Sequence, residues 1–98
     1  MHIAELEPLL KKVIVLRGNP STRDVVAFVE ELVELANTPA AAQSACDSII
    51  SMCNPRAWGD RFVEGVGEDF LAWQAFLGEL SDLAAKCGQA IYDNRRRA

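Results

Sequence analysis

The 98-residue chain has a single histidine, His2, and no two cysteines separated by two residues. Nucleophilic catalysis needs a base beside the nucleophile, and one histidine at the extreme N-terminus excludes Ser–His–Asp and Cys–His arrangements. Zinc and di-iron sites need Cys-x-x-Cys or Glu-x-x-His patterns, which the chain lacks. We therefore expect a protein that is not an enzyme, with no catalytic residues, no metal and no other cofactor.

Long apolar segments are also missing. No run approaches the roughly 20 apolar residues that a membrane-spanning helix requires. The first seven residues carry Glu5 and Glu7, where a signal peptide would carry basic residues. These features predict a cytoplasmic protein that does not act at a membrane.

The three cysteines are Cys46, Cys53 and Cys87. Cys46 and Cys53 are seven residues apart, so on one helix they would be separated by roughly 10 Å of rise. That separation is too large for a disulfide bond, and an odd number leaves at least one thiol free. We expect small buried thiols, since free cysteine is usually buried.

Composition places the chain among globular proteins. Half of the residues are apolar and 24% are charged, which is the balance of a folded domain and not of a disordered chain. The length fits one domain, covering residues 1–98.

Three helices are expected in the first half, over residues 8–17, 22–36 and 39–53. Gly18 is a natural end for the first helix, Ser21 or Thr22 would cap the second, and Thr38 would cap the third. In the second helix the apolar residues recur with helical spacing, and Phe28 and Leu35 widen that apolar face.

The second half is more regular. Apolar residues recur in steps of three and four over more than three heptads: Val66, Phe70, Trp73, Leu77, Leu80, Ala84, Cys87 and Ile91. The pattern predicts a short helix over 55–64, a hinge at 65–67 and a long helix over 68–95. Ala84 and Gly88 would let another helix approach closely.

Together these segments predict an all-α fold, a small up-and-down bundle of four to five helices with a long C-terminal helix. The three earlier helices are about half as long as the last one. Part of its apolar stripe would then stay uncovered, so a structural homodimer or larger homo-oligomer through the long helix is one alternative for the function.

Charge is unevenly distributed within the net charge of −4. Residues 24–93 carry twelve acidic side chains and three basic ones. Such a surface repels nucleic acid and favours a partner protein with a basic surface, although a merely solvated surface would have the same composition. The candidate acidic contacts form two clusters: Glu30, Glu31 and Glu34, and Asp60, Glu64, Glu68 and Asp69.

Five of the seven aromatic residues fall within residues 58–76. Phe70 and Trp73 lie on the heptad stripe and are expected in the core. Phe76 lies off the stripe and Trp58 stands at an expected helix start. Both are therefore candidates for exposed anchors that contact a partner, because interface hot spots favour large aromatic residues.

Two pairs of carboxylates are each spaced three residues apart: Glu31 with Glu34, and Glu79 with Asp82. Each pair lies on one helix face, and two such helices packed together could hold Mg²⁺. The pattern resembles that of the all-α nucleotide pyrophosphohydrolases of the MazG type, which carry Glu-x-x-Glu and Glu-x-x-Asp on successive helices. The resemblance implies a Mg²⁺-dependent enzyme as a second alternative. Val33 replaces the usual glycine, and 44 residues separate the pairs.

The leading hypothesis is a small acidic protein-binding module. It would act as an inhibitor or adaptor by occupying a surface of its partner. Compact, acidic, all-helical chains of this length resemble, in type though not through any motif, the small inhibitor proteins that phages and mobile elements carry, anti-CRISPR proteins among them.

Overall fold

The computed structural model describes residues 3–54, 56–59 and 70–97. These residues form helices and turns and no strand, which confirms the all-α class. In chain order they form η1 (Ala4–Leu6), α1 (Glu7–Val13), η2 (Ile14–Leu16), η3 (Pro20–Thr22), α2 (Arg23–Leu35), α3 (Pro39–Met52) and α4 (Phe70–Arg97), where η marks a 3-10 turn.

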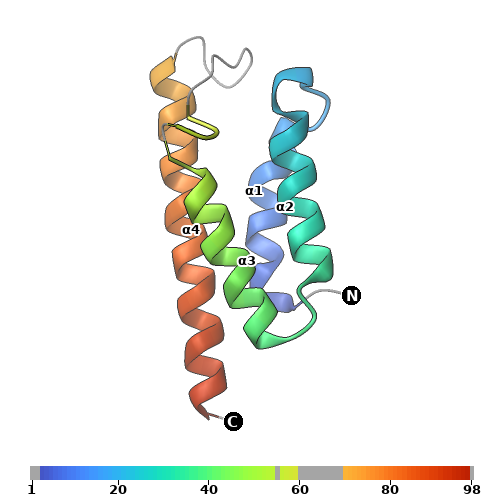
Figure 1. Cartoon of the computed structure of the whole chain (residues 1–98), viewed down its shortest axis with the longest axis vertical. Helices are drawn as coiled ribbons and strands as arrows, with labels where there is room; N and C mark the ends of the chain where they lie inside the picture. The colour runs from blue at the N-terminus through green and yellow to red at the C-terminus, as the bar shows by residue number, and fades with distance from the viewer. Residues whose placement is uncertain (1–2, 55, 60–69, 98) are drawn as a thin grey trace.

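The four α-helices pack as a bundle around one core (Figure 1). α4 packs along α3 and against α1, and α2 packs against α1 and α3. α2 and α4 therefore lie across the bundle from each other. The molecule measures 45 × 21 × 18 Å, and 28-residue α4 extends along the longest of these dimensions. The predicted helical bundle with a long C-terminal helix is confirmed. Within the described residues, no helix has the length and apolar character to cross a membrane.

Polar side chains and one glycine set the helix ends in the first half. Gly18 has φ of +86°, a conformation that glycine adopts without strain. Thr38 caps α3 as predicted, since its hydroxyl accepts a hydrogen bond of 3.1 Å from the Ala41 N–H. Thr22 does not cap α2. Its hydroxyl instead donates to the Leu16 carbonyl at 3.2 Å, while the Asn19 side chain accepts from the Ser21 N–H.

Two predicted helices differ from the structure. The expected helix over 8–17 is divided, because its last turn tightens into the 3-10 turn η2. The expected helix over 55–64 lies mostly outside the described residues, as does the hinge at 65–67. Residues 56–59 form turns, and Asn54 Oδ1 accepts hydrogen bonds from the N–H groups of Arg56 and Ala57. An asparagine that binds the following backbone in this way favours a turn.

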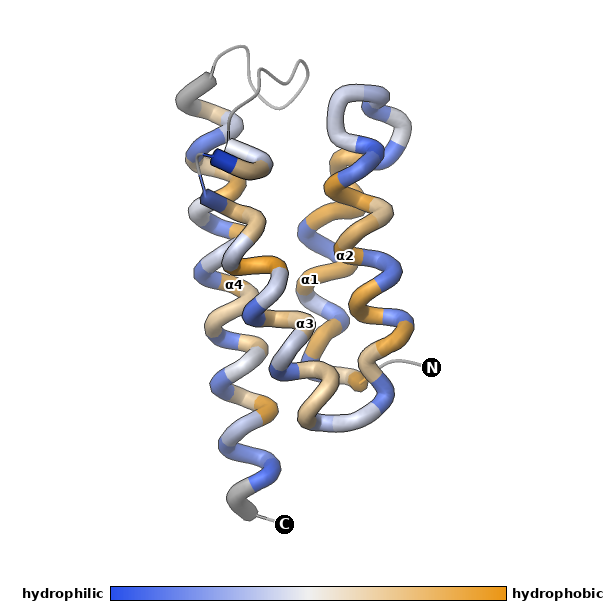
Figure 2. Tube along the Cα trace, in the orientation of Figure 1, coloured by the Kyte–Doolittle hydropathy of each residue, from blue (hydrophilic) through white to orange (hydrophobic). Residues whose placement is uncertain are grey.

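The core contains the predicted stripe of α4. Its described members are at most 4% exposed: Trp73, Leu77, Leu80, Ala84, Cys87 and Ile91. Over residues 73–91 the shorter helices therefore cover the stripe, contrary to the expectation that part of it stays uncovered, while its first two members, Val66 and Phe70, lie outside the residues whose side chains the structure describes. Over residues 73–91 this stripe therefore offers no uncovered face to a second copy, and the homo-oligomer stays a prediction. Figure 2 shows the most hydrophobic stretches in α1 and α2, whereas the last turns of α4 are largely hydrophilic.

The contact between α3 and α4 depends on small side chains. A methyl group added at Gly88 would lie 3.6 Å from Cys46 Cβ, and Ala84 is fully buried. The predicted close approach of a helix at Ala84 and Gly88 is confirmed, and the approaching helix is α3.

Two glycine-to-alanine substitutions should change stability in opposite directions. Gly78 lies within α4 with no atom near its missing Cβ, so Gly78→Ala should stabilise the fold by about 0.5–1 kcal/mol. Gly18→Ala should destabilise it by about 1 kcal/mol or more, because alanine is strained at positive φ. Urea denaturation monitored by circular dichroism measures both changes. Equal shifts of the midpoint would contradict the assigned conformation of Gly18.

Candidate functional site

Hydrogen bonds from two side chains of α4 hold the turn that follows α3. Trp73 Nε1 donates a hydrogen bond of 2.7 Å to the Trp58 carbonyl, and Gln74 Nε2 donates to the Gly59 carbonyl at 2.5 Å. Trp58 is 2% exposed, and its position is in a turn, not at a helix start. The prediction that Trp58 is an exposed anchor is therefore wrong.

Further aromatic contacts extend from this point to both sides of the bundle. Trp58 meets Phe28 of α2 edge to face, with ring centroids 5.2 Å apart. Trp73 stacks on Phe76 at 5.5 Å, and Lys12 Nζ lies 4.8 Å from the centroid of the Phe76 ring. Phe76 is 7% exposed, so it also is not an exposed anchor. Heptad spacing placed it off the buried stripe, but α1 covers this side of α4.

Removing the indole N–H donor of Trp73 should lower the free energy of unfolding. Trp73→Phe would leave the buried Trp58 carbonyl without its partner and would open a small cavity, so we expect a loss of about 2–4 kcal/mol in unfolding free energy. Gln74→Ala, which removes a part-buried hydrogen bond to the neighbouring Gly59, should cost less, about 1 kcal/mol. Equilibrium urea denaturation compares the two. Similar losses for both variants would argue against the special role of Trp73.

The predicted acidic residues of α2 fall into different environments. Glu30 is partly buried and forms an ion pair of 2.5 Å with Arg17. Glu31 and Glu34 are exposed on the outer side of α2. The second predicted cluster (Asp60, Glu64, Glu68 and Asp69) lies outside the described residues.

The structure does not bring the two carboxylate pairs together. Glu31 and Glu34 lie on α2, whereas Glu79 and Asp82 lie on α4 across the bundle, and Glu79 is paired with Lys12 at 2.5 Å. In the part of the chain that the structure describes, no group of three or more histidine, cysteine or acidic side chains could hold a metal ion. The magnesium cluster implied by the resemblance to MazG-type enzymes is therefore wrong.

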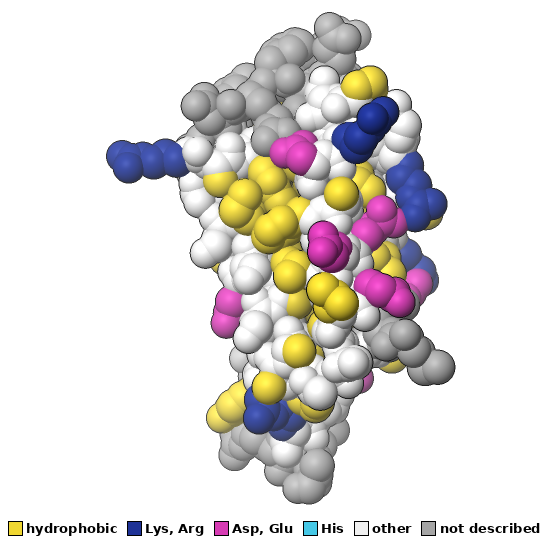
Figure 3. All heavy atoms as spheres, turned by 45° about the vertical axis from the view of Figure 1, so that its right-hand side comes forward, with side chains coloured by type: hydrophobic (Ala, Val, Ile, Leu, Met, Phe, Trp, Pro, Cys, Tyr) yellow, Lys and Arg dark blue, Asp and Glu magenta, His cyan; other side chains and the backbone are white. Residues whose placement is uncertain are grey.

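An apolar surface lies between α2 and α3, and we call it the α2–α3 surface. It consists of a hollow lined by Phe28 of α2 and by Ser48, Ser51 and Met52 of α3, together with Leu32 and Leu35, which follow Phe28 at helical spacing along α2. Leu35 is 66% exposed, and Phe28 and Leu32 are half-buried. Figure 3 shows apolar side chains gathered on this face with acidic side chains beside them. The spacing of Phe28 and Leu35 predicted a wider buried face, but α3 covers only part of it.

The α2–α3 surface has acidic residues on both helices. Glu31 and Glu34 are exposed on α2, and Asp47 is exposed on α3. At the end near Phe28 and Met52 the surface contains a hollow of about 330 Å³, which Asp47 also lines. An apolar surface with carboxylates beside it is suited to bind a partner segment that has both apolar and basic side chains.

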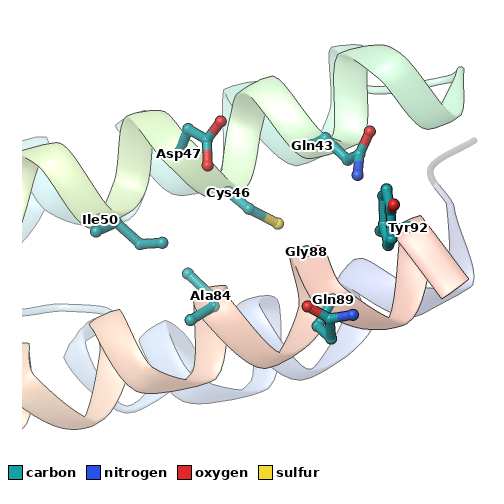
Figure 4. A pocket seen from close by; sticks show the side chains of 9 residues that line it. Gln43, Cys46, Asp47, Ile50, Ala84, Gly88, Gln89 and Tyr92 are labelled. Atoms are coloured by element: carbon teal, nitrogen blue, oxygen red, sulfur yellow. The ribbon is translucent and has the colours of Figure 1, made fainter.

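A second hollow, the α3–α4 groove, lies on the other side of α3 (Figure 4). Its volume is about 550 Å³, and its lining includes Cys46, Asp47 and Ile50 of α3 and Ala84, Gly88 and Tyr92 of α4. Cys46 points from α3 toward Gly88, while Gln43 and Tyr92 lie at one end. Ala84 and Gly88 lie at the bottom of the groove, where α3 and α4 approach each other closely. Sequence reasoning missed this site, although Ala84 and Gly88 gave the signal for close packing.

The three cysteines are free thiols, as expected from the sequence, and Cys46 and Cys87 are buried. Burial raises the pKa of Cys46 to about 11, and nearby Cys87 and Asp47 add to the increase. Burial also raises the pKa of Cys53 to about 11 and raises that of Cys87. Because the thiolate is the reactive form, these thiols are not suited to act as nucleophiles near neutral pH.

These pKa shifts predict a loss of stability at alkaline pH. A thiol whose pKa rises from 9.0 to about 11 on folding favours the folded state below pH 9, and this contribution disappears as the pH rises to 11. The denaturation midpoint should fall over that interval. A variant with Cys46→Ala and Cys53→Ala should show a smaller fall. An equal fall in the variant would assign the pH dependence to other groups.

Comparison with known proteins provides no assignment, because no family model, curated protein or solved structure matches the chain.

Proposed function

We propose that the protein is a protein-binding module that docks onto a basic partner through the α2–α3 surface. By covering that partner's surface it would act as an inhibitor or an adaptor. The observation that supports this function is the exposed apolar stripe of α2, above all Leu35, beside the exposed carboxylates of Glu31 and Glu34.

The apolar side chains would supply most of the affinity. Each Å² of apolar surface removed from water contributes about 25 cal/mol. Phe28 is well placed for this role, because Trp58 supports its ring from inside the bundle at 5.2 Å. A ring held in one position loses little conformational freedom when a partner covers it.

The carboxylates would select the partner and speed its approach. Exposed charges at the edge of an interface act mainly on the association rate, and salt weakens that effect. An acidic surface also fits a protein whose own basic surface binds nucleic acid, and occupying that surface would block it. An inhibitor of a nucleic-acid-binding enzyme, such as an anti-CRISPR protein, is one form of this function.

Charge reversal on α2 tests the electrostatic part. The wild type should capture a stoichiometric partner from bacterial lysate at low salt and release it at high salt, as read by mass spectrometry. Glu31→Lys with Glu34→Lys should slow association with that purified partner by about tenfold. The matched control is Asp82→Lys with Asp93→Lys, which changes the net charge equally on exposed positions of α4.

An apolar pair of variants tests the contact itself. Leu35→Ser should weaken binding, whereas Val15→Ser should leave it unchanged, because Val15 is 72% exposed on η2, away from this surface. Both variants should fold normally, since both side chains are largely in solvent. Equal affinities for wild type and Leu35→Ser, together with equal association rates for the two charge-reversed proteins, would refute the proposed surface.

A further inference from the structure

We infer that the partner's docking segment is extended, crosses α3 from one side to the other and places a basic side chain over Asp47. One apolar side chain would enter the hollow at Phe28 and Met52, and a second would enter the α3–α4 groove. This inference rests on the proposed function, since it names the chemistry of the segment bound beside the α2–α3 surface.

Asp47 is the residue that links the two hollows. It is exposed on α3 and lines both the hollow of the α2–α3 surface and the α3–α4 groove. A carboxylate in this position lies between a largely apolar hollow on the α2 side and a groove on the α4 side that has both apolar and amide side chains in its lining. It would attract a cation carried between two apolar side chains of the same segment.

The outer side of α3 presents a low ridge between these hollows. Its exposed residues recur at helical spacing and are small apart from the aspartate: Ala40, Ser44, Asp47 and Ser51. No long side chain from this row stands in the path of a crossing segment. The backbone of a partner could therefore approach α3 while its side chains reach down on both sides.

The α3–α4 groove has the volume, about 550 Å³, to accept an apolar side chain. Ala84 and Gly88 form part of its lining, and Ile50 and Tyr92 provide larger apolar surfaces. Tyr92 is 47% exposed, so part of its surface is in contact with solvent. At the far end Arg95 donates a hydrogen bond to Gln43, so a cation there would meet like charge while Asp47 attracts it at the other end.

The geometry of an extended chain matches this arrangement. In an extended segment, residues i, i+2 and i+4 point to the same side, and i and i+4 are about 13 Å apart. A helix with its side chains is about 10–12 Å across. The segment should therefore read apolar–x–basic–x–apolar, with the basic residue at i+2 above Asp47.

A short peptide is a direct probe of this arrangement. The peptide acetyl-Gly-Leu-Ser-Arg-Ser-Leu-Gly-amide should shift NMR signals of the ¹⁵N-labelled full chain on both sides of α3, at Ser48 and Met52 and at Gly88 and Tyr92. Two control peptides should bind about tenfold more weakly or not at all. One replaces Arg with Glu, and the other exchanges Arg with the preceding Ser, which moves the cation to the opposite side.

Variants of the protein test each contact separately. Asp47→Asn should lower the affinity for the peptide by several-fold. Ser51→Phe would fill the hollow of the α2–α3 surface, and Ala85→Phe would fill the α3–α4 groove, because each residue is exposed and lines that hollow. Each variant should also lower the affinity for the peptide by several-fold. Ala90→Phe is the matched control, because Ala90 is exposed on α4 and is not among the groove residues. Circular dichroism establishes that each variant is folded.

The outcomes separate this inference from the proposed function. Shifts confined to one hollow, no shifts at about 5 mM peptide, or equal affinity for the Asp47→Asn variant would overturn the crossing segment. If the lysate partner still depends on Glu31, Glu34 and Leu35 in those cases, the proposed function stands without it. If the peptide binds in both hollows but the lysate partner binds the Glu31, Glu34 and Leu35 variants as tightly as the wild type, the crossing segment is supported and the α2–α3 surface is refuted.

Discussion

The hydrogen bond from the Trp73 indole to the Trp58 carbonyl is the constraint on which the arrangement of the helices depends. It is buried, so an unpaired partner would carry the full cost of desolvation. The bond fixes the turn that follows α3 against α4, close to the end of α3. With that end fixed, Trp58 can support Phe28 of α2, and α3 is held between α2 on one side and α4 on the other.

The position of α3 explains why the molecule has a hollow on each side of it. Against α4 the packing is close because Ala84 and Gly88 are small, and the groove opens above them. Against α2 the larger Phe28 and Leu32 stay half-buried, so an apolar surface remains in contact with water. One helix with small outer residues therefore creates two depressions, and Asp47 borders both.

Two acidic residues form ion pairs within the chain, and others lie exposed beside apolar side chains. Glu30 is engaged by Arg17, and Glu79 by Lys12, which also lies over the Phe76 ring. Both pairs lie at the surface, where an ion pair contributes about 0–1 kcal/mol, and each engages a carboxylate within the chain. Glu31 and Asp47 are instead exposed beside apolar side chains, which is the arrangement that favours a basic, partly apolar partner.

The all-α class, the cap at Thr38, the turn at Gly18 and the buried stripe of α4 over residues 73–91 could be predicted from the sequence, because each depends on local geometry or on helical period. Which of the other apolar residues stay exposed depends on how the helices pack. Trp58 and Phe76 are buried where they meet Phe28 of α2 and Lys12 of α1, whereas Leu35, the last residue of α2, is 66% exposed. Helical spacing places a side chain on a face, but the neighbouring helices determine whether that face meets protein or water.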